Sequence, residues 1–133
     1  VCAHDRLQGY RDGLAEVGIP FDSDLVREGD FIQASGFQQG RVLLQHPEPP
    51  TAIIASNDVM AFGVMDAAKA ADIFMTSQVY PSLTTIRQPL AEMGEAALEM
   101  LVTVLQGRKV LNPRRELPTE LIIRQSTGPV RPR

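Results

Sequence analysis

The chain has no tryptophan, two tyrosines and a single cysteine among its 133 residues. One cysteine, Cys2, cannot form a disulfide within the chain, which suits a reducing compartment but does not require one. No stretch is long and apolar enough to span a membrane, and the first residues do not form a signal peptide. The sequence therefore gives no reason to expect a membrane partner.

Motifs of catalysis and of metal binding are missing as well. The two histidines, His4 and His46, stand far apart, and Cys2 near His4 does not resemble an activated thiol. There is no glycine-rich phosphate loop, no H-E-x-x-H and no pair of cysteine ligands. The formal net charge of -3 does not favour nucleic-acid binding by this segment. We therefore expect no enzyme, no cofactor and no metal.

What the chain does have is regular apolar periodicity. With 44% apolar and 22% charged residues it has the composition of one globular domain or of part of one. Asp5 is a possible N-cap of the first helix and Gly18 ends it, whereas Pro89 stands in the first turn of the last helix and Gly107 ends that one. Spacing predicts four helices, over Asp5–Val17, Gln33–Gln45, Asp58–Ala71 and Pro89–Gln106.

Short apolar runs between the helices predict strands. Thr51–Ser56 is continuously apolar up to its last residue, which is typical of a strand buried on both faces. Asp24–Phe31 is predicted to be a short strand and a turn, and Leu83–Arg87 and Leu117–Gln125 hold two more strands. Because strands and helices alternate, we predict an α/β fold with a mostly parallel sheet and flanking helices. Only Ala70–Ser82 breaks the alternation, since it contains no clear strand.

Three side chains are candidates for contacting a ligand. A strand end that delivers polar groups to a helix start is where open α/β sheets bind ligands. The amide of Asn57 stands at such a junction and suits a hydroxyl-rich ligand, or it caps the helix. Arg6 is either a fork donor to a ligand oxygen or a surface arginine. Phe31 either stacks on a sugar or base, or packs in the core.

Several motifs, in this order, resemble the lac repressor/galactose repressor (LacI/GalR) family of bacterial transcription regulators. They are D-R-L-Q-G-Y-R-D-G-L (Asp5–Leu14), S-N-D-V-M-A-F-G (Ser56–Gly63), L-T-T-I-R-Q-P (Leu83–Pro89) and L-P-T-E-L-I-I-R-Q-S-T (Leu117–Thr127). The resemblance covers nearly the whole chain. It implies that residues 1–127 are the C-terminal part of an effector-binding core, with residues 128–133 as a flexible tail. That core is a type I periplasmic-binding-protein-like fold, two α/β lobes with the ligand between them.

The same resemblance assigns roles to the three candidates. Arg6 matches an arginine that contacts the effector, Phe31 an aromatic that stacks on it, and Asn57 an amide that hydrogen-bonds it. The effector would be a sugar, a sugar phosphate or a purine. A fourth contact departs from the family pattern, because Asp72 matches the second of two aspartates and Ala71 stands where the first, ligand-contacting one belongs.

A core strand of the family is missing before Asp72. A true deletion would leave the neighbouring strands with unpaired backbone groups, so we favour a gap in the sequence.

The resemblance implies a ligand-responsive transcription repressor in the cytoplasm. The effector would shift the arrangement of the lobes and so bias heads that bind operator DNA, which are not in this chain. The family forms homodimers, and Phe62 would match the dimer surface unless it is a core residue. The other residues that would match that surface are Gln78, Val79, Tyr80 and Pro81. Alternatives are a periplasmic sugar-binding protein of a transport system and, less well supported, a flavodoxin-like enzyme.

Overall fold

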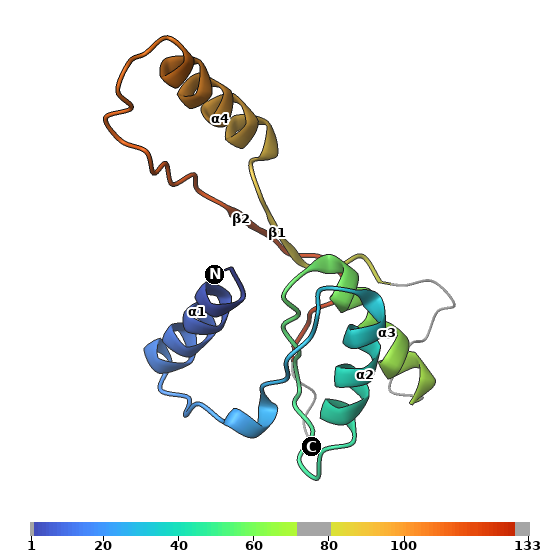
Figure 1. Cartoon of the computed structure of the whole chain (residues 1–133). Helices are drawn as coiled ribbons and strands as arrows, with labels where there is room; N and C mark the ends of the chain where they lie inside the picture. Colours follow the sequence, from blue (N-terminus) through green and yellow to red (C-terminus); the bar gives the residue numbers. More distant parts are fainter. Residues whose placement is uncertain (1, 72–80, 130–133) are drawn as a thin grey trace. The chain divides into compact units, whose positions relative to one another are not determined.

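The computed structural model describes residues 2–71 and 81–129, in two compact units (Figure 1). Unit 1 comprises Val1–Tyr80 with Pro129–Arg133, and unit 2 comprises Pro81–Gly128. The described elements of unit 1 are α1 (Cys2–Glu16), the short 3-10 helix η1 (Ser23–Leu25), α2 (Gln33–Leu44) and α3 (Asp58–Ala70). Those of unit 2 are β1 (Thr85–Arg87), α4 (Leu90–Leu105) and β2 (Glu120–Ile122).

The first helix confirms the predicted periodicity but not its predicted cap. It begins at Cys2, so Asp5 lies within the first turn, where a carboxylate faces the positive end of the helix dipole. Gly18 ends the helix as predicted, with φ of 71°. Its N–H donates to the carbonyl of Ala15 at 3.1 Å, and the next N–H, of Ile19, donates to that of Leu14 at 2.9 Å. These are the bonds that close a helix with a left-handed glycine.

The second and third helices pack on each other, backbone against backbone (Figure 1). A Cβ added at Gly36 would overlap the backbone oxygen of Met60, and one at Gly63 would overlap that of Gln33. One turn further along α2, Gly40 lies against Val64 of α3. Since these contacts advance together along both helices, α2 and α3 run in the same direction. Only glycine at these positions allows so close an approach.

The buried core of unit 1 lies at this contact. Leu43 on α2, and Met60 and Ala67 on α3, are buried, Ala67 with no exposed surface. Burial of a methionine side chain stabilises the fold by about 2 kcal/mol. At the edge of the contact, Gln33 Nε2 donates to Asp66 Oδ2 at 2.7 Å. The predicted helices Gln33–Gln45 and Asp58–Ala71 are thus confirmed, with ends shifted by one residue.

Two predicted strands of unit 1 are wrong. Thr51–Ser56 forms no strand, and Ile54 is 79% exposed. Within the described part of the chain, no other segment pairs with its backbone, and an apolar run becomes a strand only by pairing. In place of the strand predicted over Asp24–Phe31, the chain forms η1 and an irregular segment. The carboxylate of Asp22 caps η1 by accepting from the N–H of Asp24 at 2.8 Å.

The strands predicted in unit 2 are confirmed, each shorter than expected. They are antiparallel, with Ile86 opposite Leu121 and Arg87 opposite Glu120. Arg87 Nη1 and Glu120 Oε2 are 3.0 Å apart in an exposed ion pair. The α/β content agrees with the prediction, but among the described residues the only ladder is antiparallel. A parallel ladder needs a neighbouring strand on the far side of a crossover, and the described segments bring none together.

A hydroxyl cluster continues the pairing of these strands, and we name it the Thr84 clasp. Thr84 Oγ1 accepts from the N–H of Arg124 at 2.8 Å and lies 2.9 Å from Thr127 Oγ1. The N–H of Thr84 donates to Ser126 Oγ at 2.8 Å, and the N–H of Ser126 donates to the carbonyl of Ser82 at 3.0 Å. Side chains thus replace the backbone ladder beyond the strands.

The last helix, α4, is apolar but scarcely buried. Pro89 takes the N-cap position instead of the first turn that we predicted, and Gly107, with φ of 70°, follows the helix as predicted. Ala96 is its one buried residue, whereas Leu98 and Leu105 are 61% and 76% exposed. Among the residues described here, no helix has the length and apolarity needed to cross a membrane.

Candidate functional site

Arg6 reaches across unit 1 to the residue that precedes Asn57. It lies in the second turn of α1, and its Nη1 donates to the backbone oxygen of Ser56 at 2.7 Å. The two residues are 50 positions apart in the chain. A guanidinium carries five N–H donors in a rigid fork, so this bond leaves several for a ligand. Arg6 is therefore more than an isolated surface arginine.

Asn57 joins the start of α3 to the backbone of Phe31. Its Oδ1 accepts from the N–H of Met60 at 2.8 Å, so Asn57 does cap α3, one of the two roles considered from the sequence. Its Nδ2 donates to the carbonyl of Phe31 at 2.9 Å. An amide has two N–H donors and an oxygen with two lone pairs. One donor and one lone pair remain for a ligand, so capping and ligand binding are compatible.

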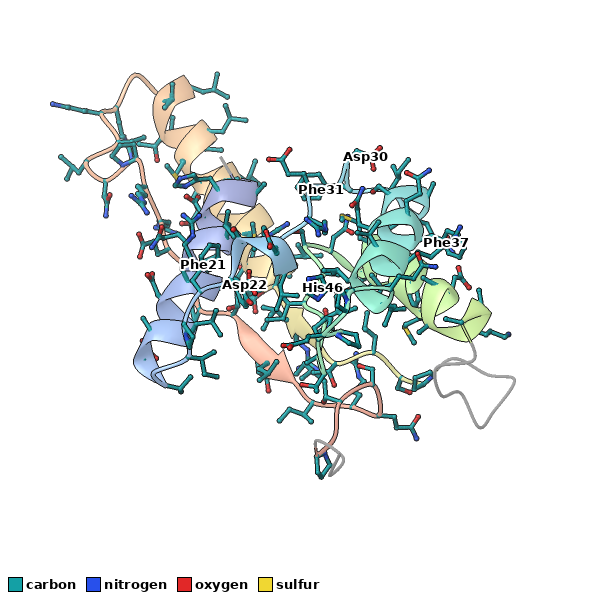
Figure 2. All side chains as sticks on the ribbon, turned by 90° about the horizontal axis from the view of Figure 1, so that it is seen from below. Phe21, Asp22, Asp30, Phe31, Phe37 and His46 are labelled. Carbon is teal, nitrogen blue, oxygen red and sulfur yellow. The ribbon has the colours of Figure 1, made fainter. Side chains whose placement is uncertain are left out.

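Phe31 is 40% exposed, so the residue is not part of the described core. Its φ is 67°, which puts its backbone in the left-handed region. Figure 2 shows Phe31 beside Asp30, just before α2. An exposed aromatic on a constrained backbone presents a flat apolar face at low entropic cost.

The turn around Phe31 is closed by local hydrogen bonds. The N–H of Asp30 donates to Ser35 Oγ at 3.2 Å, and Ser35 Oγ donates to the carbonyl of Ile32 at 3.0 Å. The N–H of Ile32 donates to Asp30 Oδ1 at 3.4 Å. The Ser35 hydroxyl, with the backbone N–H of Ile32, lowers the pKa of the exposed Asp30 carboxyl from its ordinary value.

Arg6, Phe31 and Asn57, all predicted from the sequence, are thus linked by hydrogen bonds within one unit. Arg6 bonds to Ser56, the neighbour of Asn57, and Asn57 bonds to Phe31. Helices α2 and α3 both begin here, with the positive ends of their dipoles. N–H donors beside an aromatic face suit a neutral or anionic ring that carries oxygens. The three linked residues therefore offer hydrogen-bond donors and an exposed aromatic side chain, not an acid and a base in contact.

Two of the other predicted site residues, Phe62 and Pro81, lie among the residues that the structure describes. Phe62 on α3 is 41% exposed and Pro81 is partly exposed. The remaining predictions, Asp72 for the effector and Gln78, Val79 and Tyr80 for the dimer surface, lie outside the described residues.

Ser35 and Asp30 are residues that the sequence did not mark as functional. A serine at the third position of a predicted helix, four residues after the end of G-D-F, was the available signal.

Other kinds of site find little support. In the described ranges, no three His, Cys, Asp or Glu side chains gather as metal ligands would. A shallow depression of about 230 Å³ lies in unit 2, lined by Gln88, Pro89, Met93, Arg115, Leu117 and Thr119. It contains none of the three linked residues, and it is lined mainly by apolar surface. We give more weight to the linked residues, because their chemistry is specific and their geometry is fixed by hydrogen bonds.

Comparisons with known proteins agree on one family. The periplasmic binding protein-like domain family matches residues 2–127. The HTH-type transcriptional repressor CytR of Escherichia coli K12 is 38% identical over 93% of this chain and 40% of its own length. The ribose operon repressor of the same strain is 36% identical over 81% of this chain and 39% of its own length. The lac repressor dimer bound to operator and an anti-inducer matches with a TM-score of 0.80 and 31% identity, over 95% of this chain and 48% of that one.

Each match covers only part of the relative, and the match to CytR includes residues that this chain lacks. The chain spans about 40% of the length of these repressors. The match to CytR is 138 residues long, more than the 93% of this 133-residue chain that it covers. The relative therefore has residues within the matched region that this chain lacks, which agrees with a missing segment without locating it.

Proposed function

Because this chain belongs to the periplasmic binding protein-like family, as an effector-binding core of the LacI/GalR type, we propose that it binds a small-molecule effector for a DNA-binding transcription repressor. In this proposal, residues 1–127 form the C-terminal part of that core. The observation that carries the proposal is the linkage of Arg6, Phe31 and Asn57 through Ser56. These three side chains support binding, because they offer hydrogen-bond donors and an exposed aromatic side chain.

The effector is a small oxygen-bearing ring, meaning a sugar, a sugar phosphate or a purine. The guanidinium of Arg6 and the remaining N–H of Asn57 donate to its oxygens or ring nitrogens. Phe31 stacks on its flat or apolar face. A pentose comes first among the candidates, because one relative represses a ribose operon. Asp72 is a further candidate contact in this proposal.

Regulation follows from the partners of the relatives. The lac repressor neighbour is a dimer on its operator. By analogy, this core forms homodimers in the cytoplasm through a surface that includes Phe62 and residues 78–81, and it acts on DNA through a separate head. The effector changes DNA affinity only as far as it binds one arrangement of the lobes better than the other.

The test uses the complete gene product and a thermal-shift screen of sugars, sugar phosphates and purines. A ligand that binds only the folded state raises the melting temperature. Asn57→Ala is compared with Asn57→Ser, because serine keeps the helix cap and loses the amide donor. We expect both variants to lose at least about tenfold in effector affinity, the effect of a lost hydrogen bond of about 1.4 kcal/mol or more.

The two variants separate binding from stability. Asn57→Ala should lose about 1 kcal/mol more unfolding free energy than Asn57→Ser, because both variants lose the bond to the Phe31 carbonyl but only alanine also removes the cap. If Asn57→Ser bound the effector with wild-type affinity, the Asn57 amide would not be part of the proposed site. A screen without any bound compound, together with enzymatic turnover or a transport role, would overturn the proposal itself.

A further inference from the structure

The backbone of Phe31 is held against its own preference. Its φ is 67°, and among the described residues it is the one non-glycine residue with a positive φ. For an L-residue this conformation is disfavoured by crowding of Cβ against the following carbonyl. It persists only where the surroundings over-determine it, and such positions gather at ligand sites. Some group in the structure must therefore hold this turn.

The hydroxyl of Ser35 bridges the residues on both sides of Phe31. It accepts from the N–H of Asp30 at 3.2 Å and donates to the carbonyl of Ile32 at 3.0 Å. A weaker bond from the N–H of Ile32 to Asp30 Oδ1, at 3.4 Å, runs parallel to this bridge. Asn57 then fixes the carbonyl of Phe31 itself. In the part of the chain that the structure describes, Ser35 is the one side chain that bonds to both Asp30 and Ile32.

The bridge is not a capping box of the helix that follows. Ile32 is the N-cap of α2 and makes no side-chain cap hydrogen bond. In a capping box, the side chain at the third helical position accepts from the N–H of the N-cap residue. Ser35 occupies that position but bonds instead to the N–H of Asp30 and the carbonyl of Ile32. Its loss should therefore free the Phe31 turn while leaving the α2–α3 contact in place.

We propose that Ser35 is a positioning residue, whose hydroxyl keeps Phe31 in its left-handed conformation so that the ring stays exposed to stack on the effector. The stacking part rests on the proposed function, whereas the holding of the turn does not. Ser35 itself need not touch the effector.

The first experiment tests, without any ligand, whether Ser35 holds the turn at Phe31. Chymotrypsin cleaves after phenylalanine, and Phe21 and Phe31 are 38% and 40% exposed, so cleavage after Phe21 is an internal standard in the same digest. The complete gene product is compared with Ser35→Ala and Ser35→Thr. In Ser35→Ala we expect cleavage after Phe31 to rise about fivefold relative to that after Phe21, the effect of losing one net hydrogen bond. Ser35→Thr keeps the hydroxyl and should behave as wild type.

The second experiment tests whether Ser35 affects ligand affinity through the ring of Phe31. The compound with the largest thermal shift in the screen is titrated against Ser35→Ala, Phe31→Leu and the double variant. We expect Ser35→Ala by itself to lower the affinity about fivefold. In the Phe31→Leu background the same substitution should lower it no further, because two residues that act through one contact are not additive. An equal loss in both backgrounds would show that Ser35 does not act through Phe31.

The two experiments fail separately. Unchanged cleavage after Phe31 in Ser35→Ala overturns the holding role, whatever binds. If no compound binds the wild-type protein, the proposed function and the role of the ring fail together, and the digest still decides whether Ser35 holds the turn.

Discussion

The two units are stabilised in different ways. In unit 1, α2 and α3 touch backbone to backbone through Gly36, Gly40 and Gly63, and most of the buried residues lie there. In unit 2, the more apolar helix α4 buries only Ala96. The pairing of the two short strands is continued there by hydrogen bonds to side-chain hydroxyls. Apolar periodicity therefore predicts a helix in both units, but it does not predict what covers the apolar face.

The contrast bears on the site, because the site is carried by the well-packed pair. Phe31 stands immediately before α2 and Asn57 immediately before α3. A binding constellation is precise when its residues extend from rigid, packed elements. The close contact of α2 and α3 therefore supports the spacing between the aromatic ring and the amide.

The largest effect we predict breaks this contact. Gly63→Ala places a methyl group where the backbone oxygen of Gln33 already lies, and 2.6 Å from the backbone nitrogen of Phe37. We expect a loss of about 3 kcal/mol of unfolding free energy, because neither backbone atom can move aside cheaply. Urea denaturation followed by circular dichroism measures it.

The matched control lies in unit 2. Gly94 is inside α4 and has no atom within 4 Å of an added Cβ. Gly94→Ala should raise stability by about 0.5–1 kcal/mol through helix propensity alone. Equal effects of the two substitutions would contradict the difference in packing between the units.

A smaller effect tests whether hydroxyl bonds support unit 2. Thr84→Val keeps the shape of the side chain but removes the oxygen that accepts from the N–H of Arg124 and contacts Thr127. We expect a loss of about 1–2 kcal/mol, because these partners stay partly unpaired. Thr119→Val is the control, since the Thr119 hydroxyl makes no hydrogen bond among the described residues. Equal stability of the two variants would mean that solvent replaces the Thr84 clasp at no cost.

The smallest effect sharpens the description of the Phe31 turn. The Asp30 carboxyl should titrate below its ordinary value of 3.8 and move back toward it in Ser35→Ala, but not in Ser35→Thr. A carboxyl whose pKa is lowered in the folded state stabilises the fold at a pH above its pKa in the unfolded state. This contribution is lost as the pH falls below 3.8 and through the pKa of the folded state. Carbon-detected NMR of the carboxyl follows the midpoint. An identical midpoint in wild type and Ser35→Ala would show that the Ser35 hydroxyl does not lower the pKa of the Asp30 carboxyl.

The helices could be predicted from the sequence because their determinants are local. The glycines at 18 and 107 end α1 and α4 as predicted, since a left-handed residue after a helix is a property of a few neighbouring residues. The strand predicted over Thr51–Ser56 failed for the opposite reason. A strand depends on a partner distant in sequence, and no described segment provides one.

The residues of the candidate site could be selected from the sequence, but not the bonds between them. Resemblance to the family selected Arg6, Phe31 and Asn57, and the structure links them by hydrogen bonds. The bonds themselves could not be predicted, because they join residues 26 and 50 positions apart. The role of Ser35 was hidden as well, since nothing in the sequence requires Phe31 to be left-handed.

The glycine contact between α2 and α3 also has a consequence for how such a protein can diverge. Where two helices are spaced by main-chain atoms, exchange of core side chains alters their separation little. A descendant that replaces the ring at position 31 or the amide at position 57 then keeps the distance between these two positions, whatever side chains they carry.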